Sequence, residues 1–327
     1  MEYVRLGSSG LNVSRICLGC MSFGNAQSWM GEADVAMPVL KRAWDLGINF
    51  FDTANVYSRG RSEEILGEFL KDIRNDAVVA TKVNGVMKEV PNGGGLSRKH
   101  VIWQCGESLR RLKTDRIDLY QIHRWDYETP IEETLCTLTD LVRSGRVLYI
   151  GASSMWARQL AKALWVSDVK GYERFVSMQN LYNLLYREEE REMIPLCLSE
   201  GIGLIPWSPT AVGVLSGEYL RNDKLATTQD DHPRLVPSSM AHKSYIEPPQ
   251  NEEIVRRVVE VSKREGVKPV QIALAWLFRK GVTSPIIGTR KVSHLEDAVG
   301  AVDVKITDDE MKYLEETYRP VPVRGHT

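Results

Sequence analysis

Short apolar segments rich in β-branched and aromatic residues alternate along the chain with longer segments whose apolar residues recur every three or four positions. The short segments are typical of strands buried on both faces, and the longer ones of amphipathic helices. Eight strands are predicted, at Arg15–Leu18, Asn49–Asp52, Val78–Thr81, Ile117–Ile122, Val147–Ile150, Phe175–Met178, Gly203–Pro206 and Thr283–Ile287. Eight helices are predicted between and after them, at Ala33–Leu46, Ser62–Lys71, Ser97–Leu112, Ile131–Ser144, Ala157–Ser167, Glu188–Glu200, Val270–Phe278 and His294–Ala301.

Turn-forming residues separate these segments. Gly47, Gly145 and Gly201 each follow a predicted helix and precede a predicted strand, as expected of residues that end a helix in the left-handed conformation. Ser62, which is followed by two glutamates, is predicted to cap the N-terminus of its helix. Eight strands alternating with helices predict the α/β fold class and, within it, a parallel sheet closed into a (β/α)8 TIM barrel.

The chain has 327 residues, whereas such barrels typically need about 250, so additions are expected. Residues 1–14 are predicted to form an N-terminal hairpin that plugs the bottom of the barrel. Residues 210–250 are predicted to form a long irregular loop after the seventh strand. Two further helices are predicted at Asn251–Glu265 and Thr307–Glu316, the second followed by a tail to residue 327. Since no linker of different composition divides the chain, residues 1–327 are interpreted as a single domain.

Composition excludes several classes of protein. Apolar residues make up 43% of the chain, and 42 basic residues balance 43 acidic ones for a net charge of −1. A disordered chain would be more polar, and a nucleic-acid-binding protein would carry a basic surface. No apolar run approaches the ~20 residues of a membrane span, and the first residues do not resemble a secretory leader. A cytoplasmic protein without nucleic-acid or membrane partners is therefore expected.

The cysteines also bear on the class of protein. They number five, are widely spaced, and suit a reducing compartment. Cys17 and Cys20 form a CxxC pair, but no second pair or histidine cluster completes a set of ligands. No metal site is therefore predicted.

Polar and aromatic residues stand where the predicted strands end, which is where (β/α)8 barrels place their active sites. The residues at or just after these ends are Asp52, Lys82, His123, Ser153, Ser154, Gln179, Trp207, Ser208, Gly288, Thr289 and Arg290. Tyr57 follows Asp52 in the next loop. One rim is therefore predicted to hold a carboxylate, a lysine, an imidazole and a phenol.

These four groups suit proton transfer to a carbonyl oxygen. Tyrosine is a poor acid at neutral pH because its ordinary pKa is ~10, but a neighbouring ammonium such as that of Lys82 lowers this pKa. A carboxylate such as Asp52 keeps the lysine charged, and His123 can donate a hydrogen bond that polarises the carbonyl. Taken singly, each residue also has a structural interpretation, such as a turn cap for Asp52. Together they predict a catalytic site with Tyr57 as the general acid.

The sequence resembles the aldo-keto reductase superfamily over essentially its whole length. The matching motifs are the segments 47–54, 80–82, 121–123, 151–154, 179–182, 207–209 and 285–289, with Tyr57 after the first. Segment 122–134 looks closest to microbial and fungal members, including versiconal hemiacetal acetate reductases and bacterial enzymes associated with 1-deoxyxylulose 5-phosphate. The resemblance implies metal-free hydride transfer from NADPH, or less favourably NADH, to a small-molecule aldehyde or ketone. It assigns the catalytic roles described above to Asp52, Tyr57, Lys82 and His123.

The resemblance also implies a cofactor site. Ser153, Ser154 and Gln179 would hold the nicotinamide amide, and an aromatic residue after the seventh strand, Trp207, would stack on its ring. A glycine-rich turn would offer the backbone amides of residues 215 and 217 to the pyrophosphate, although glutamate stands at 218 where relatives often carry lysine. The implied set is Gly19, Met21, Asp52, Ser153, Ser154, Gln179, Trp207, Ser208, Pro209, Gly213, Leu215, Gly217, Ile287, Gly288, Thr289, Arg290, His294 and Asp297.

At the adenosine end, Arg290 and Lys291 stand beside the helix that starts near His294 and would bind the 2′-phosphate. Asp297 is followed by alanine where the family has a Glu-Asn pair, so the adenine contacts are expected to differ. No Gly-x-Gly-x-x-Gly motif follows a strand and opens a helix, which disfavours a Rossmann-type nucleotide site.

The substrate pocket is predicted to include Trp29, Tyr57, His123, Arg124 and Trp125. Arg124 would bind an anionic substrate group or form an ordinary surface ion pair, and both interpretations are open. Two other function classes are open as well. One is a non-catalytic or slow NADPH-binding regulator, like the β subunits of voltage-gated potassium channels, which share this superfamily. The other is a sugar-phosphate isomerase or lyase, which the four catalytic groups disfavour. The sequence predicts no particular substrate and no oligomeric state.

Overall fold

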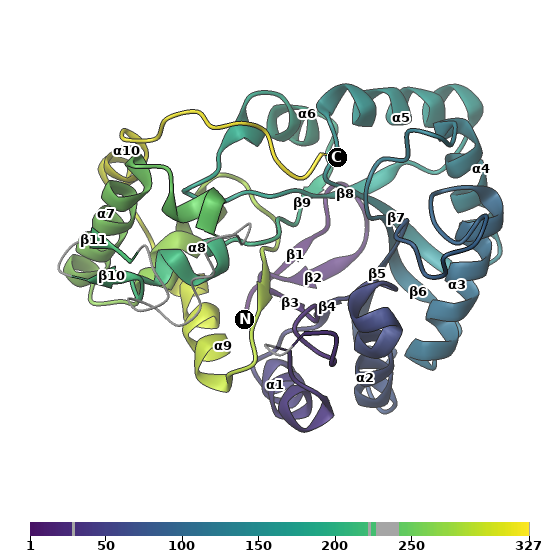
Figure 1. The fold of residues 1–327 in the computed structure, drawn as a ribbon, viewed down its shortest axis with the longest axis horizontal. Helices are drawn as coiled ribbons and strands as arrows, with labels where there is room; N and C mark the ends of the chain where they lie inside the picture. The colour runs from purple at the N-terminus through teal and green to yellow at the C-terminus, as the bar shows by residue number, and fades with distance from the viewer. Residues whose placement is uncertain (28–29, 222–223, 227–241, 327) are drawn as a thin grey trace.

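The computed structural model describes residues 1–27, 30–221, 224–226 and 242–326 (Figure 1). Eight strands form one sheet in the order β12-β3-β4-β5-β6-β7-β8-β9, and every neighbouring pair is parallel. Hydrogen bonds from Thr283 N to the Leu204 oxygen (2.8 Å) and from Ile286 N to the Pro206 oxygen (2.9 Å) join the two ends of the sheet. The predicted (β/α)8 barrel is confirmed. Its strands are β3 (Cys17–Gly19), β4 (Phe50–Asp52), β5 (Val78–Val83), β6 (Ile117–Ile122), β7 (Val147–Ser153), β8 (Phe175–Gln179), β9 (Gly203–Leu204) and β12 (Ile286–Gly288).

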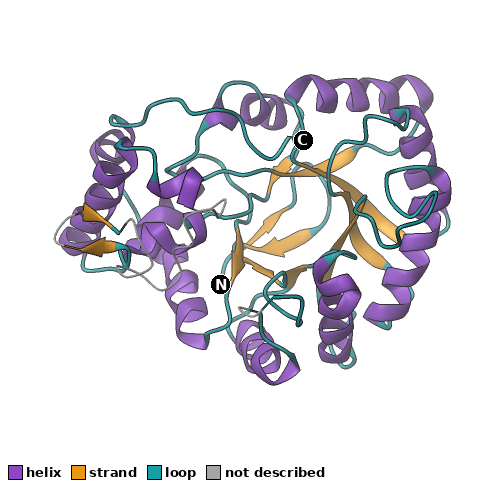
Figure 2. Ribbon diagram, viewed as in Figure 1, coloured by secondary structure: helices purple, strands orange, loops and turns teal. Residues whose placement is uncertain are grey.

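Helices surround the barrel (Figure 2). Those that alternate with the strands are α1 (Ala33–Asp45), α2 (Arg61–Leu70), α3 (Arg98–Leu112), α4 (Ile131–Arg143), α5 (Ala157–Lys170), α6 (Met193–Ser199), α8 (Pro269–Arg279) and α9 (Val292–Val299). The two additional helices are present as α7 (Gln250–Glu265) and α10 (Asp308–Glu315), which contact each other. None of the helices in the described ranges has the length and apolarity that a membrane span requires.

The N-terminal hairpin closes the bottom of the barrel. Its strands β1 (Tyr3–Arg5) and β2 (Asn12–Ser14) pair antiparallel. The turn between them reaches the start of β9, where Ser8 N donates to the Gly201 oxygen at 2.6 Å. Gly7 has a φ of +60°, and a Cβ there would lie 2.4 Å from the Gly201 oxygen, so only glycine fits. Apolar side chains of the hairpin join the cluster inside the barrel. A ligand can therefore approach the barrel interior only from the other end.

Five strands, β3, β5, β7, β8 and β12, run further at their carboxyl ends than the sequence predicts. β5, β7 and β8 include Lys82, Ser153 and Gln179, which the sequence places just after the strand ends. Lys82 lies in register with Gln121, and Ser153 with Gln179. The polar residues continue the strands because each finds hydrogen-bond partners inside the barrel. Their side chains are therefore held by the sheet, which is stiffer than a loop.

The prediction of one continuous helix at Glu188–Glu200 is wrong. A short 3-10 helix, η2 (Glu188–Glu190), precedes α6. Pro195 lies in the first turn of α6. Proline has no N–H and is best accommodated in the first turn of a helix, which fits a start of α6 just before it.

Ser62 is not the cap of α2. The helix begins at Arg61, directly after Gly60. The Ser62 hydroxyl points inward and contacts the Cys20 carbonyl at 2.7 Å and the Thr53 hydroxyl at 2.8 Å. This contact ties the start of α2 to the segments that follow β3 and β4, because a buried hydroxyl gains most where it can both donate and accept.

The segment 210–250 is not wholly irregular. Among its described residues are the 3-10 helix η3 (Ala211–Ser216), a small hairpin of β10 (Leu220–Arg221) and β11 (Lys224–Leu225), and the π-helix η4 (His242–Ile246). The prediction is therefore wrong for these residues. Residues 222–223 and 227–241 of the segment lie outside the described part of the chain.

The tail after α10 returns to the open end of the barrel, which we call the mouth (Figure 1). The His326 imidazole lies 2.9 Å from the Glu189 carboxylate and edge-on to the Trp156 ring. The His326 carbonyl accepts a hydrogen bond from the Tyr127 hydroxyl at 3.3 Å. Since Tyr127 and Trp156 follow β6 and β7, the tail forms part of the wall of the mouth.

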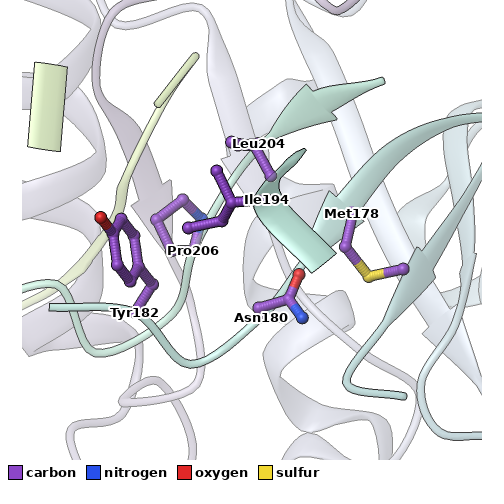
Figure 3. Close-up of a pocket in the computed structure, with 6 residues that line it drawn as sticks. All are labelled: Met178, Asn180, Tyr182, Ile194, Leu204 and Pro206. Carbon is purple, nitrogen blue, oxygen red and sulfur yellow. The ribbon is translucent and has the colours of Figure 1, made fainter. Parts of the chain in front are cut away.

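A small cavity lies between β8, β9 and α6 (Figure 3). It is lined by Met178, Asn180, Tyr182, Ile194, Leu204 and Pro206. Its volume is about 10 Å³, which leaves room for at most a single water molecule. This cavity is a packing gap, and a ligand site has to be sought at the mouth.

Candidate active site

Lys82 is the centre of a buried polar cluster at the mouth. Its side chain, on β5, is fully buried. The ammonium donates to Asp52 Oδ2 at 2.6 Å, to the Thr53 carbonyl at 2.8 Å and to the Tyr57 hydroxyl at 3.2 Å. Burial lowers the pKa of Lys82, but Asp52 and Tyr57 outweigh burial, so that the pKa lies above its ordinary value. Lys82 therefore stays charged inside the protein.

Asp52, the last residue of β4, accepts hydrogen bonds at both carboxylate oxygens. Oδ2 binds Lys82, while Oδ1 accepts from Gln121 Nε2 at 3.0 Å and from Gln179 Nε2 at 2.9 Å. Gln179 Nε2 also donates to Gln121 Oε1 at 3.1 Å. Because an ionised carboxylate only accepts, these contacts fix the orientation of both side-chain amides. Gln179 Oε1 receives no hydrogen bond from a described residue and is available to a ligand.

Tyr57 begins the 3-10 helix η1 (Tyr57–Gly60), which follows β4. Its ring packs edge-on against His123, with 5.8 Å between the ring centroids. Burial raises the pKa of Tyr57, whereas Lys82 and Arg124 lower it, and the net pKa lies above the ordinary value. The effect of Lys82 has the predicted sign, but burial outweighs it. Tyr57 therefore holds its proton at neutral pH.

His123 follows β6 and lines a cavity of about 220 Å³ together with Asn84, Gly85 and Arg124. Burial lowers the pKa of His123 well below its ordinary value, and the charges of Lys82 and Arg124 lower it further. The imidazole is therefore neutral at pH 7 and carries one N–H. No described residue accepts a side-chain hydrogen bond from His123, so this N–H is available to a carbonyl oxygen in the cavity.

The depressed pKa of His123 predicts a loss of stability in acid. An unfolded chain binds a proton at this imidazole below pH ~6.5, whereas the folded protein does not until a lower pH, so the free energy of unfolding falls as the pH falls. Protonation of the unfolded imidazole sets an upper bound of about 2 kcal/mol on this loss between pH 7.5 and pH 5. The measurement is urea denaturation of the wild type and of His123→Gln across this range. Equal losses in the two proteins would contradict the depressed pKa.

A second group of predicted residues meets beside Gln179. The hydroxyls of Ser153 and Ser154 donate to the Gln179 carbonyl at 2.8 and 3.5 Å. The Trp207 indole N–H donates to the Ser154 hydroxyl at 3.1 Å. Gly325 of the tail lies against Trp207, since a Cβ there would be 3.3 Å from the indole. Because Gln179 also reaches Asp52, this group and the Lys82 cluster form one continuous site.

The amides expected to bind pyrophosphate are already hydrogen-bonded within their own turn. Gly213 N and Leu215 N both donate to the Thr210 oxygen, at 3.0 and 3.2 Å, and Gly217 N donates to the Val214 oxygen at 3.3 Å. In this arrangement η3 satisfies its own backbone donors, and the pyrophosphate contact of Leu215 and Gly217 stays a prediction.

The other residues predicted to bind the cofactor lie on or near β3, β12 and α9 and in the segment after β9. Gly19 and Gly288 are neighbours on the paired strands β3 and β12. Arg290 is exposed and, within the described ranges, forms no ion pair. The remaining predicted residues are Met21 after β3, Ile287 on β12, Thr289 after it, His294 and Asp297 on α9, and Ser208 and Pro209 between β9 and η3.

The predicted substrate-pocket residues are only partly brought together. His123 and Arg124 line the same cavity, and Tyr57 contacts His123. Trp125 is half-buried and packs against the main apolar core. Trp29 lies outside the described residues.

Two parts of the site are not predicted from the sequence. Gln121 is one, although a polar residue in the otherwise apolar end of β6 is a signal for an inward-facing site residue. The tail is the other, and no local pattern marks it, because its contacts are with residues far away in the chain. His326 and Glu189, for example, are 137 positions apart.

The His, Cys, Asp and Glu side chains bear on metal and thiol chemistry. Where the structure describes the chain, no group of three or more His, Cys, Asp or Glu side chains is arranged to hold a metal ion. All five cysteines are free thiols. Cys17 and Cys20 are fully buried, and burial raises the pKa of both thiols. They act as small packing residues of the barrel, since a protonated buried thiol is inert.

The comparisons with known proteins agree with one another. Residues 15–319 match the model of the aldo/keto reductase family. The chain is 41% identical to the aldo-keto reductase dtxS3 of Metarhizium robertsii, over 100% of this chain and 94% of the relative. It is 40% identical to a putative aryl-alcohol dehydrogenase of Schizosaccharomyces pombe, over 99% and 97%. It is 39% identical to versiconal hemiacetal acetate reductase of Aspergillus parasiticus, over 98% of each chain.

Proposed function

The chain belongs to the aldo/keto reductase family, and on that basis we propose that it reduces aldehydes or ketones to alcohols with NADPH as the hydride donor and Tyr57 as the general acid. One observation carries the proposal: the buried Lys82 ammonium contacts both the Tyr57 hydroxyl and the Asp52 carboxylate. This contact couples a proton donor to a charged group that stabilises the phenolate left after proton transfer.

The side chains act in sequence on the carbonyl. His123, which is neutral, donates a hydrogen bond that orients and polarises the carbonyl oxygen. The cofactor, when bound, supplies the hydride. Tyr57 gives its proton to the oxygen as negative charge develops there, and Lys82 stabilises the phenolate that remains. Asp52, held by two amides, keeps Lys82 charged throughout.

Three features of the chain fit a nicotinamide cofactor. Gln179 Oε1, which no described donor reaches, suits the N–H groups of a carboxamide. The Trp207 indole, held by Ser154, offers a half-buried aromatic face. Arg290 offers a guanidinium that pairs with no carboxylate in the part of the chain described. Gln179 and Trp207 would hold the nicotinamide, and Arg290 a phosphate of the adenosine end.

Replacing Arg290 with alanine is expected to weaken NADPH binding about tenfold, because a charge-assisted contact to the 2′-phosphate is lost. NADH lacks this phosphate, so its affinity should change little. Titrations that follow quenching of tryptophan fluorescence at fixed ionic strength measure both constants. Arg5→Ala, on the hairpin at the other end of the barrel, is the control for the change in net charge. Equal weakening of NADPH and NADH would rule out the 2′-phosphate role.

The proposed function is tested with the purified chain, NADPH and a panel of carbonyl compounds that includes aromatic aldehydes, dicarbonyls and sugar phosphates. Loss of NADPH absorbance with at least one of them is the expected result. A tight NADPH complex without turnover across the panel would instead favour a regulatory NADPH-binding protein.

A further inference from the structure

Arg124 lines the same cavity as His123. The residue directly follows His123 at the end of β6, and the cavity of about 220 Å³ is completed by Asn84 and Gly85, which follow β5. Arg124 thus contributes a positive charge to the chamber in which a carbonyl oxygen would meet His123. The sequence alone leaves open whether this charge is neutralised by a neighbouring carboxylate.

The structure answers that question for the described residues. Arg124 is half-buried, and none of their carboxylates lies within ion-pair distance of it. Nη1 donates to the carbonyl of His123 at 2.6 Å, and the other N–H groups of the guanidinium have no acceptor among these residues. Burial lowers the pKa of Arg124, which reflects the cost of holding a charge away from water without a partner. An anion in the cavity would compensate that cost.

The guanidinium is also fixed in place. The contact of Nη1 with the His123 carbonyl holds the side chain back against its own backbone. Asn84 Nδ2 donates to the Arg124 carbonyl at 2.8 Å and so ties that backbone to the end of β5. A donor held in one orientation loses little entropy on binding, so the arrangement is prepared for a ligand.

We infer that Arg124 forms an anion subsite of this cavity, and that the substrate is a small aldehyde or ketone bearing a carboxylate or phosphate group. The inference rests on the proposed carbonyl reduction. A planar guanidinium matches both kinds of oxyanion with paired hydrogen bonds. Since His123 and Arg124 are adjacent, the carbonyl and the anion belong to one short molecule. The cavity agrees, because 220 Å³ is below the range of about 300 to 1,000 Å³ of sites for larger ligands.

Matched substrates test the inference. The carboxylate pair is 5-oxopentanoate and pentanal, and the phosphate pair is glyceraldehyde 3-phosphate and glyceraldehyde. The readout is the ratio of kcat/KM for the anionic member to kcat/KM for the neutral member, which cancels any effect common to both. In the wild type at least one ratio should exceed about ten. The pair with the larger ratio identifies the anion.

Variants at Arg124 assign the preference to this residue. Arg124→Gln should lower the larger ratio about tenfold or more, and Arg124→Lys should retain part of it, because lysine keeps the charge but not the paired geometry. Arg143→Gln is the control, since it removes the same charge from the last turn of α4, at the opposite end of the barrel, and should leave the ratio unchanged. A wild-type ratio near one, or a ratio that Arg124→Gln does not change, would overturn the inference and leave carbonyl reduction intact.

A binding measurement separates the two proposals. Calorimetry with pentanoate and with propyl phosphate, neither of which has a carbonyl to reduce, needs no turnover. Binding of at least one of them to the wild type that is weakened about tenfold in Arg124→Gln would support the subsite even if no carbonyl in the panel were reduced, in which case only the proposed function would fail. Equal binding of each ligand to both proteins, or binding of neither ligand, would overturn the subsite.

Discussion

Replacing Tyr57 with phenylalanine is expected to lower kcat at least about 100-fold, the effect of removing a general acid, while NADPH affinity stays nearly unchanged. The substitution keeps the ring and its edge-on packing against His123 but removes the hydroxyl that Lys82 contacts at 3.2 Å. No other hydroxyl is hydrogen-bonded to Lys82 in the part of the chain described. Steady-state kinetics with a saturating carbonyl, together with a fluorescence titration of NADPH, separate the two effects.

Tyr3→Phe is a matched control for this experiment. It removes a hydroxyl of the same kind, which contacts the Gly47 carbonyl at 2.8 Å on the bottom of the barrel. Its kcat should equal that of the wild type. A Tyr57→Phe protein that retains more than about a tenth of the wild-type kcat would exclude Tyr57 as the general acid.

Lys82→Met should affect both activity and stability. Without the ammonium, burial and Asp52 raise the pKa of Tyr57 unopposed by Lys82, so kcat should fall about 100-fold. Asp52 would be left buried without its counter-ion, and breaking a buried pair in this way costs about 3 to 5 kcal/mol. Two amides still donate to Asp52, so the lower end of this range is expected. Urea denaturation and turnover measure the two effects.

The double variant Asp52→Asn/Lys82→Met separates the effect of leaving a buried charge unpaired from the effect of changing the shape of the side chain. It removes both partners, so it should recover much of the lost stability while turnover stays low. It also keeps the test informative if Lys82→Met does not fold. If Lys82→Met unfolded at the same urea concentration and turned over at the same rate as the wild type, the proposed role of the buried pair would be wrong.

The barrel and the position of the proposed catalytic groups can be predicted from local pattern. Apolar segments of strand length alternate with amphipathic helices, and the carboxyl ends of parallel strands meet at one rim. This is sufficient to predict that Asp52, Lys82 and His123 lie at the same mouth. Their catalytic roles stay predictions, which the substitutions above test.

The other features of the site depend on contacts and burial that no local pattern in the sequence encodes. Gln179 donates to Asp52 across 127 positions of sequence, and Gln121 reaches it from a third strand. The pKa of Tyr57 is a balance between burial and charge, so the presence of Lys82 in the sequence gives the sign of one contribution but not the net result. The amides of Leu215 and Gly217 show the same limit, because a glycine-rich pattern does not reveal that η3 satisfies its own donors.

The wall that the tail contributes to the mouth has an evolutionary consequence. The tail adds no strand to the barrel, yet it lies against Trp207 and is fixed by His326 to Glu189. Terminal segments outside the core tolerate substitution better than barrel strands do. Selection for a new range of substrates can therefore act on the tail, while selection for stability acts on the strands, and the two pressures fall on different parts of one gene.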